Sequence, residues 1–242
     1  MNTAIVIALA LGAYLLGSIP SAVWIGKIFY GVDVRTKGSG NAGTTNVLRV
    51  LGAKAALPVF VIDMLKGYAA VSLATLGPIA PESPNFLYVK MALCVLAVVG
   101  HMYPVFAGFR GGKGVATLVG AMFAFSVGGI LLSLATFVVI VSLTHYVSVG
   151  SMVGGLLLPF YAALTGDTDW RLILFFALIS LLLFYTHRTN IGRLLHGTEN
   201  KTHLFGRSKQ GSKSRATYCR ATKKEYLCTP FRGVPERNKA DN

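Results

Sequence analysis

The segment GSGNAGTTNVLR, residues 38–49, is a polar, glycine-rich stretch with long apolar runs on both sides, and it organises the rest of the chain. Between apolar helices such a segment is unfavourable in lipid unless it faces water or a polar ligand. Its three glycines let backbone N–H groups approach an anion, and Arg49 offers a planar fork of donors that suits phosphate. The segment therefore predicts a phosphate-handling site at a membrane surface.

The same segment also fits G-x-G-x-x-G, the fingerprint of dinucleotide-binding folds, and Asp63 lies twenty residues beyond Gly43. That fingerprint requires a buried strand before it and a βαβ unit around it. Here a helix-length apolar run precedes it, and no alternation of strands and helices follows. The context therefore favours an all-α membrane protein over a dinucleotide-binding domain.

The composition agrees with a polytopic membrane protein. Of the 242 residues, 53% are hydrophobic and 13% are charged, whereas a soluble domain carries about 25% charged residues. The first apolar run has no basic residue before Ile5 and continues past Trp24 without a small-residue cleavage pattern, so we interpret it as a first span rather than a signal peptide.

Seven apolar runs follow one another along the chain. They cover approximately residues 4–26, 55–78, 86–107, 114–131, 132–149, 151–166 and 170–186. A membrane-spanning helix needs about 17–25 residues, which the first three runs and the last one reach. The region 114–166 fits either three short spans or one long span with re-entrant material. We predict seven transmembrane helices, with five as the alternative.

The distribution of charge predicts the topology. Lysine and arginine gather in three polar segments, at 27–54, 110–113 and 188–201, while the short loops PIAPESPN and TGDTDW carry only acidic charges. The positive-inside rule places the three basic segments in the cytoplasm. The N-terminus is then outside and the C-terminus cytoplasmic, which requires an odd number of spans.

The sequence divides into two parts of different character. Residues 1–201 are expected to form the membrane-embedded domain. Residues 202–242 form a basic tail without apolar periodicity, which we expect to be disordered; residues 203–242 carry half of the net charge of +14.

The second polar segment contains Arg110-Gly111-Gly112-Lys113-Gly114 at the expected start of a helix. A glycine-rich turn before a helix presents free N–H groups and a partial positive charge, to which Lys113 adds a point charge. The spacing is not that of a Walker A loop. A basic interfacial anchor with glycines for close packing is the alternative explanation.

The third polar segment, THRTNIGRLLHGTENK at 186–201, places His187 and Asn190 on one helix face if the helix continues. We expect Glu199 to pair with a nearby cation. Asp63 and Lys66 are also spaced i, i+3, and we expect a structural pair that supports the first segment. Three such segments on one side of the membrane predict a single site for anionic groups.

Together the three segments resemble the motifs of the bacterial acyl-phosphate:glycerol-3-phosphate acyltransferases, the PlsY family. The matching elements are Ser39 with Arg49, the RGGKG turn, and HRTNI from His187 through Arg193, Gly197 and Glu199. The resemblance implies transfer of a fatty acyl group from acyl phosphate to the 1-hydroxyl of glycerol 3-phosphate, giving 1-acylglycerol 3-phosphate and phosphate. It further implies a multi-pass protein of the bacterial inner membrane with its active site on the cytoplasmic face.

The resemblance, with the chemistry of the three segments, yields a set of candidate residues. The expected catalytic residues are Ser39, Arg49, Lys113, His187 and Asn190. The expected substrate-binding residues are Gly38, Gly40, Asn41, Gly43, Asn46, Arg110, Gly111, Gly112, Gly114, Arg188, Arg193 and Glu199. We expect no cofactor, no metal and no nucleic-acid partner, and we expect a monomer in the lipid bilayer.

Two questions stay open at this point. The proton of the attacking hydroxyl could pass to His187 or to the oxygens of the acyl phosphate, and the second is favoured because no carboxylate is placed to orient the imidazole. A transporter of a phosphorylated solute would also explain spans, glycines and cations, although it predicts a site near the bilayer midplane in repeated halves, and a lipid-binding scaffold is a further alternative.

Overall fold

The computed structural model describes residues 3–164 and 169–202, and all secondary structure within them is helical. The expected disorder of the tail concerns residues 203–242, which lie outside the described part, as does Asp167 of the TGDTDW loop. The α-helices are α1 Thr3–Gly17, α2 Ser21–Tyr30, α3 Thr44–Leu51, α4 Ala53–Ser72, α5 Phe86–Met102, α6 Val115–Phe123, α7 Val127–Thr144, α8 Val147–Leu164, α9 Trp170–Thr186 and α10 Arg188–Leu195. Three short 3₁₀ helices, η1 Val34–Thr36, η2 Leu73–Leu76 and η3 Val105–Ala107, join them.

Four helices in the described residues are long and apolar enough to cross a membrane, and the number rises to six if each of two bent pairs counts as one span. The four are α4 and α5, each with its short 3₁₀ extension, together with α7 and α8. The bent pairs are α1 with α2, at 42°, and α9 with α10, at 58°. The prediction of an all-helical protein with several apolar helices is therefore confirmed.

The ambiguous region 114–166 contains three helices, of which α7 and α8 are long and apolar enough to cross a membrane. Breaks at residues 124–126 and 145–146 separate α6, α7 and α8, and the predicted boundaries were several residues too late. His145 ends α7 in the left-handed conformation, with φ of 63°. The nine residues of α6 span only about 14 Å, far less than the roughly 30 Å of a bilayer core.

Small residues set the packing of the long helices. A Cβ on Gly67 of α4 would lie 1.9 Å from the carbonyl oxygen of Thr117, and one on Gly120 of α6 would lie 1.8 Å from that of Met64. Gly17 and Gly100 allow a similar approach between α1 and α5. Backbone contact at this distance is available only to glycine, so these positions fix α4 against α6 and α1 against α5.

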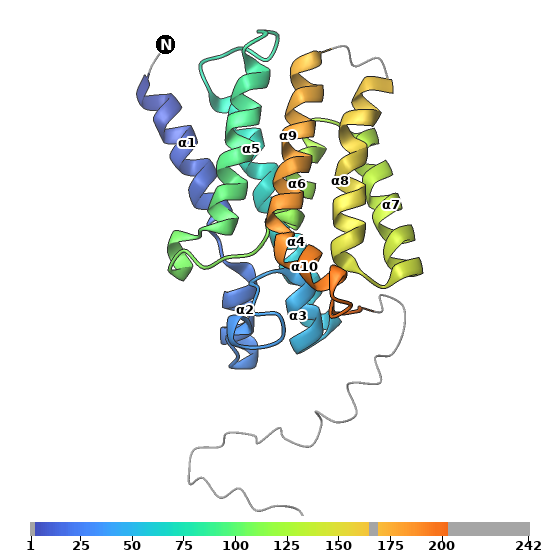
Figure 1. The fold of residues 1–242 in the computed structure, drawn as a ribbon. Helices are drawn as coiled ribbons and strands as arrows, with labels where there is room; N and C mark the ends of the chain where they lie inside the picture. Colours follow the sequence, from blue (N-terminus) through green and yellow to red (C-terminus); the bar gives the residue numbers. More distant parts are fainter. Residues whose placement is uncertain (1–2, 165–168, 203–242) are drawn as a thin grey trace, which may run out of the picture. The chain divides into compact units, whose positions relative to one another are not determined.

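Short elements gather at one end of the long helices. Figure 1 shows α2, α3 and α10 together below the bundle, next to the turn between α7 and α8. The chain reaches this end with the N-terminus of α6 and the C-terminus of α9, so the three polar segments of the sequence meet there.

Candidate functional site

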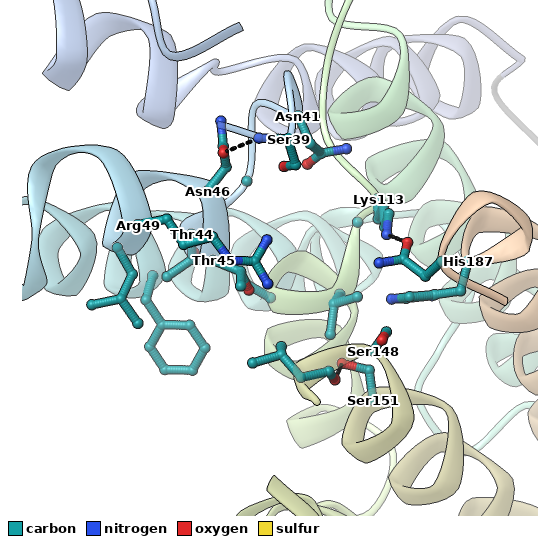
Figure 2. Close-up of a pocket in the computed structure, with 18 of the residues that line it drawn as sticks. Ser39, Asn41, Thr44, Thr45, Asn46, Arg49, Lys113, Ser148, Ser151 and His187 are labelled. Carbon is teal, nitrogen blue, oxygen red and sulfur yellow. Dashed lines mark hydrogen bonds between the residues drawn. The ribbon is translucent and has the colours of Figure 1, made fainter. Parts of the chain in front are cut away.

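A cavity of about 320 Å³ opens at this end of the helices. Its wall is formed by the loop before α3, the start of α6, the turn between α7 and α8, and α10 (Figure 2). The predicted site residues on its lining are Ser39, Asn41, Gly43, Asn46, Arg49, Lys113, Gly114, His187, Asn190, Arg193 and Glu199. All three polar segments therefore contribute to one cavity.

Asn46 holds the loop that carries Ser39. Its side-chain oxygen accepts a hydrogen bond from the backbone N–H of Ser39 at 2.8 Å (Figure 2), and its amide nitrogen donates to the carbonyl oxygens of Val34 and Lys37 at 2.7 and 3.1 Å. Gly38 is needed beside it, because φ is 58° and a Cβ there would lie 2.4 Å from the Asn46 Oδ1. With its buried amide used in this way, Asn46 shapes the cavity wall.

Two glycines of the RGGKG turn do not have the role that the sequence predicted for them. The N–H of Gly111 donates to the Met102 carbonyl at 3.1 Å, and that of Gly112 donates to the His101 carbonyl at 3.2 Å. The expectation that these two N–H groups are free to cradle an anion is therefore wrong. The turn instead carries Lys113, whose Nζ donates to the side-chain oxygen of Asn190.

Glu199 links α10 to the start of α8 in one network. Its Oε1 accepts from Asn190 Nδ2 at 2.6 Å and from Ser148 Oγ at 3.0 Å, and its Oε2 pairs with Arg193 Nε at 2.7 Å. The predicted pairing of Glu199 with a cation is confirmed. Hydrogen bonds and the Arg193 charge hold the pKa of this carboxyl below its usual value although burial opposes them.

His187 stands at the end of α9 with one ring nitrogen already occupied. Its Nδ1 lies 2.8 Å from the Leu183 carbonyl oxygen, and a carbonyl can only accept, so Nδ1 carries the proton and Nε2 is left as an acceptor. Burial, followed by the nearby Lys113 charge, lowers the pKa of His187 to about 4. The imidazole is neutral at physiological pH.

Arg49, on α3, lines the cavity, and not all of its guanidinium donors have hydrogen-bond partners among the described residues. Its Nη2 donates to the Asn200 carbonyl and to Thr202 Oγ1, both at 3.1 Å, while its buried Nε has no hydrogen-bond partner among the described residues. Burial lowers the pKa of the guanidinium, against the attraction of Glu199. A buried donor without a partner favours a ligand that supplies an acceptor.

Positive charge exceeds negative charge around the cavity. The side chains of Arg49, Lys113 and Arg193 line it together with the carboxylate of Glu199, while the second lining carboxylate, Asp63, pairs with Lys66 at 2.8 Å. Burial lowers the pKa of Lys113 to about 8; Glu199 opposes this shift and the two arginines add to it. Such a site attracts anions, and a bound anion would raise that pKa again.

Several predicted site residues do not line the cavity. Arg188 lies over the ring of Tyr185, at 4.4 Å from the centroid, and donates to the Tyr185 carbonyl. The others outside the lining are Gly38, Gly40, Arg110, Gly111 and Gly112. Those positions shape the loops that present their neighbours, or lie at the exposed surface.

Other lining residues were not anticipated as site residues. They are Thr44, Thr45, Ser148, Ser151, His101 and the apolar group Leu48, Phe60, Val115, Ala116, Phe137 and Val147. Thr189 of α10 is a further such residue. The sequence indicates these residues only weakly, because an uncharged hydroxyl or an apolar side chain in an apolar helix is typical of a core residue. Figure 2 shows Ser148 and Ser151 on the side of the cavity opposite Ser39 and Asn41.

No group of three or more metal-binding side chains occurs within 3–164 and 169–202. The donors on the cavity wall are cations, amides and hydroxyls, which suit anionic and hydroxylated ligands.

Comparisons with known proteins agree with this chemistry. The family model described as "Glycerol-3-phosphate acyltransferase" matches residues 7–197. Curated relatives named glycerol-3-phosphate acyltransferase include one from Geobacillus kaustophilus, 46% identical over 85% of this chain and 98% of the relative, and one from Listeria monocytogenes, 44% identical over 81% and 96%.

Two solved structures are also similar. One is the crystal structure of PlsY, an integral membrane glycerol 3-phosphate acyltransferase, in its glycerol 3-phosphate form. It has a TM-score of 0.74 and 38% identity, covering 83% of this chain and 99% of that one. The lysophosphatidic acid form gives a TM-score of 0.71 and 37% identity, covering 82% and 95%.

Proposed function

The chain belongs to the glycerol-3-phosphate acyltransferase family, and on that premise we propose how its cavity transfers the acyl group. It is an integral membrane enzyme that acylates glycerol 3-phosphate. Our proposal concerns the acyl donor, the roles of the side chains and the placement in the membrane.

The observation that carries the proposal is the excess of cations over carboxylates in one cavity at the end of the helices. We propose acyl phosphate as the donor, so that both substrates bring a phosphate to this cavity. Arg49, Lys113 and Arg193 supply three positive charges against one carboxylate, that of Glu199, since Asp63 is neutralised by Lys66. This excess of positive charge matches two phosphate-bearing ligands better than one.

In the proposed reaction the 1-hydroxyl oxygen of glycerol 3-phosphate attacks the carbonyl carbon of acyl phosphate. The bond from that carbon to the phosphate oxygen breaks, and phosphate leaves with its electron pair. Lys113 counters the charge of the leaving phosphate, and Arg49, Ser39 and Asn190 orient glycerol 3-phosphate. No covalent acyl-enzyme is needed because the mixed anhydride is already activated.

The proton of the attacking hydroxyl passes to the leaving phosphate in this proposal. His187 accepts a hydrogen bond from the hydroxyl through Nε2 and orients it, but its low pKa and its carbonyl partner make it a weak base. His187→Gln keeps an acceptor near that place. We expect its kcat to stay within about tenfold of the wild type; a loss of a thousandfold or more would make histidine the base.

For the membrane placement we propose seven crossings, by α1, α4, α5, α6, α7, α8 and α9. In Figure 1 these helices alternate in direction along the chain. We further propose that the cavity opens on the cytoplasmic face of the bacterial inner membrane, with the N-terminus outside and the C-terminus inside, because the positive-inside rule favours basic segments in the cytoplasm. We propose a monomer, with 202–242 as a separate tail.

The donor is tested with purified enzyme in detergent. We expect phosphate release from palmitoyl phosphate only when glycerol 3-phosphate is present, and no transfer from palmitoyl-CoA run beside it. Transfer from the thioester without reaction of palmitoyl phosphate would overturn the donor assignment.

A further inference from the structure

Behind the cavity wall lies a second buried polar cluster, formed by Ser21, Asp63, Lys66, His101 and Thr117. It comes from the start of α2, from α4, α5 and α6, and two of its members, Asp63 and His101, also reach the cavity lining. We infer that His101 is a positioning residue for acyl transfer, held by Thr117 and Asp63 beneath the turn that carries Lys113. This inference rests on the role proposed above for Lys113.

The RGGKG turn lies directly on His101. The backbone carbonyl of His101 accepts the N–H of Gly112 at 3.2 Å, and a Cβ added to Gly112 would lie 2.3 Å from the His101 Nε2. A Cβ on Gly111 would lie 1.9 Å from the same carbonyl oxygen. Because Gly111 and Gly112 have no Cβ, the turn can contact both the ring and the backbone of His101. This contact lies directly before Lys113 in the chain.

The cluster fixes the orientation of the ring. His101 Nδ1 lies 3.0 Å from Thr117 Oγ1 and 3.7 Å from Asp63 Oδ1. The same carboxylate oxygen accepts from Ser21 Oγ at 2.7 Å and pairs with Lys66 Nζ at 2.8 Å. With a hydroxyl and a carboxylate both beside Nδ1, the imidazole has one preferred orientation under the turn.

The cluster also reaches the break between α1 and α2, and the turn above the cluster contacts the first polar segment. Lys66 Nζ donates to the Ile19 carbonyl at 2.7 Å, in the break between α1 and α2. A Cβ on Gly112 would lie 3.0 Å from the carbonyl oxygen of Ala42, so the turn and the Ser39 loop meet above His101. The two loops that present Ser39 and Lys113 therefore share one support.

Helix packing alone does not require these charges. The close contacts of Gly67 and Gly120 already fix α4 against α6, and an apolar set of similar volume often stabilises a core as well as a buried ion pair does. Asp63 Oδ2 is buried without a hydrogen-bond partner in the described residues, which adds to the free-energy cost of burying this cluster. The cost is explained if the cluster sets the place of Lys113, because a displacement of about 1 Å at a reacting centre can lower a rate a hundredfold.

A double-mutant cycle tests the inference. We expect His101→Asn to lower kcat about thirtyfold while KM for glycerol 3-phosphate stays within about threefold. In a Lys113→Ala background the same change should cost less than about threefold, because its effect passes through Lys113. An equal loss in both backgrounds would overturn the inference. Full activity of Lys113→Ala alone would instead overturn the role of that lysine and the inference with it.

Thr117 supplies a milder, conservative pair of variants. Thr117→Val removes the hydroxyl at nearly constant volume and should lower kcat about fivefold, whereas Thr117→Ser keeps the hydroxyl and should stay within about twofold. Ser180→Ala is the matched control, since Ser180 is buried in α9 and bonds only to the carbonyls of Gly155 and Phe176. It should lower the melting temperature without changing kcat. The same result for Thr117→Val, a lower melting temperature with unchanged kcat, would mean that the cluster is only structural.

Discussion

Two arginines of this protein show the difference between a structural cation and one that is available to a ligand. Arg171, at the start of α9, donates to both oxygens of Asp169 at 2.8 and 2.6 Å and to the Pro84 carbonyl at 2.9 Å, and lies over the ring of Tyr88. Within the described residues Arg49 donates hydrogen bonds only through Nη2, and its buried Nε has no partner there.

Arg171 and Arg49 lie at opposite ends of the long helices. The donors of Arg171 fix a loop to a helix, and its charge is matched by the carboxylate of Asp169, two residues before it. The cavity end gathers Arg49, Lys113 and Arg193 around Glu199, so charge and hydrogen-bonding capacity remain for a ligand. Cations that are incompletely matched, rather than cations as such, mark the site.

The largest expected effect comes from removing the most deeply placed cation of the site. Lys113→Ala should lower kcat about a thousandfold, because it removes the charge opposite the leaving phosphate. Lys27→Ala is the matched control: this lysine is half-exposed on α2, pairs with Asp33 at 3.3 Å, and should leave kcat unchanged. A loss within tenfold for Lys113→Ala would contradict the proposed role.

The carboxylate that organises the cavity should have the next largest effect. Glu199→Gln weakens the contacts to Arg193 and Asn190, and we expect kcat/KM for glycerol 3-phosphate to fall by about ten- to a hundredfold. Glu82→Gln changes an exposed carboxylate in a loop and serves as the control. Equal activities of the two variants would separate Glu199 from the site.

The pH dependence sharpens the comparison further. With a pKa of about 8, Lys113 is charged below that pH and loses its charge above it, so kcat/KM, which reports on the free enzyme, should fall as pH rises through 8. His187, with a pKa of about 4, stays neutral from pH 5 to 7 and should produce no decline there. Lys113→Arg should move the alkaline decline upward. A decline below pH 7 in the wild type would point to histidine instead.

The smallest effect is expected at Ser148. Its hydroxyl is one of three groups on Glu199, and the other two remain after Ser148→Ala. We expect kcat/KM to fall about three- to fivefold, in line with the loss of one hydrogen bond. Initial rates with glycerol 3-phosphate as the varied substrate measure this, and a loss above a hundredfold would give Ser148 a direct role in the reaction.

The sequence predicted much of the helical architecture because apolar runs of helix length and Gly/Pro breaks are local signals. The run 170–186 coincides with α9, and Pro104 follows the end of α5. Within 114–166 the sequence is apolar throughout, so hydropathy could not locate the breaks at 124–126 and 145–146. The short α6 packs mainly against α4, and His145 turns the chain between α7 and α8; no local pattern reveals either feature.

The three polar segments could be predicted as one site because charge is rare in apolar helices and each segment combines cations with small or amide residues. The separate roles of the residues within these segments could not be predicted. Gly111 and Gly112 lose their N–H groups to the Met102 and His101 carbonyls, and Arg188 turns toward Tyr185. Ser148 escaped notice because a hydroxyl near a helix start is common and its partner, Glu199, lies 51 residues away.

The proposed site requires that Arg49 is available to a phosphate and that Arg171 is not. Calorimetric titration of glycerol 3-phosphate into purified wild type, Arg49→Ala and Arg171→Ala tests this. We expect Arg49→Ala to bind at least about thirtyfold more weakly, as expected for loss of a charged hydrogen-bonding partner. Arg171→Ala should bind like the wild type and melt at a lower temperature. Unchanged binding by Arg49→Ala would contradict the account.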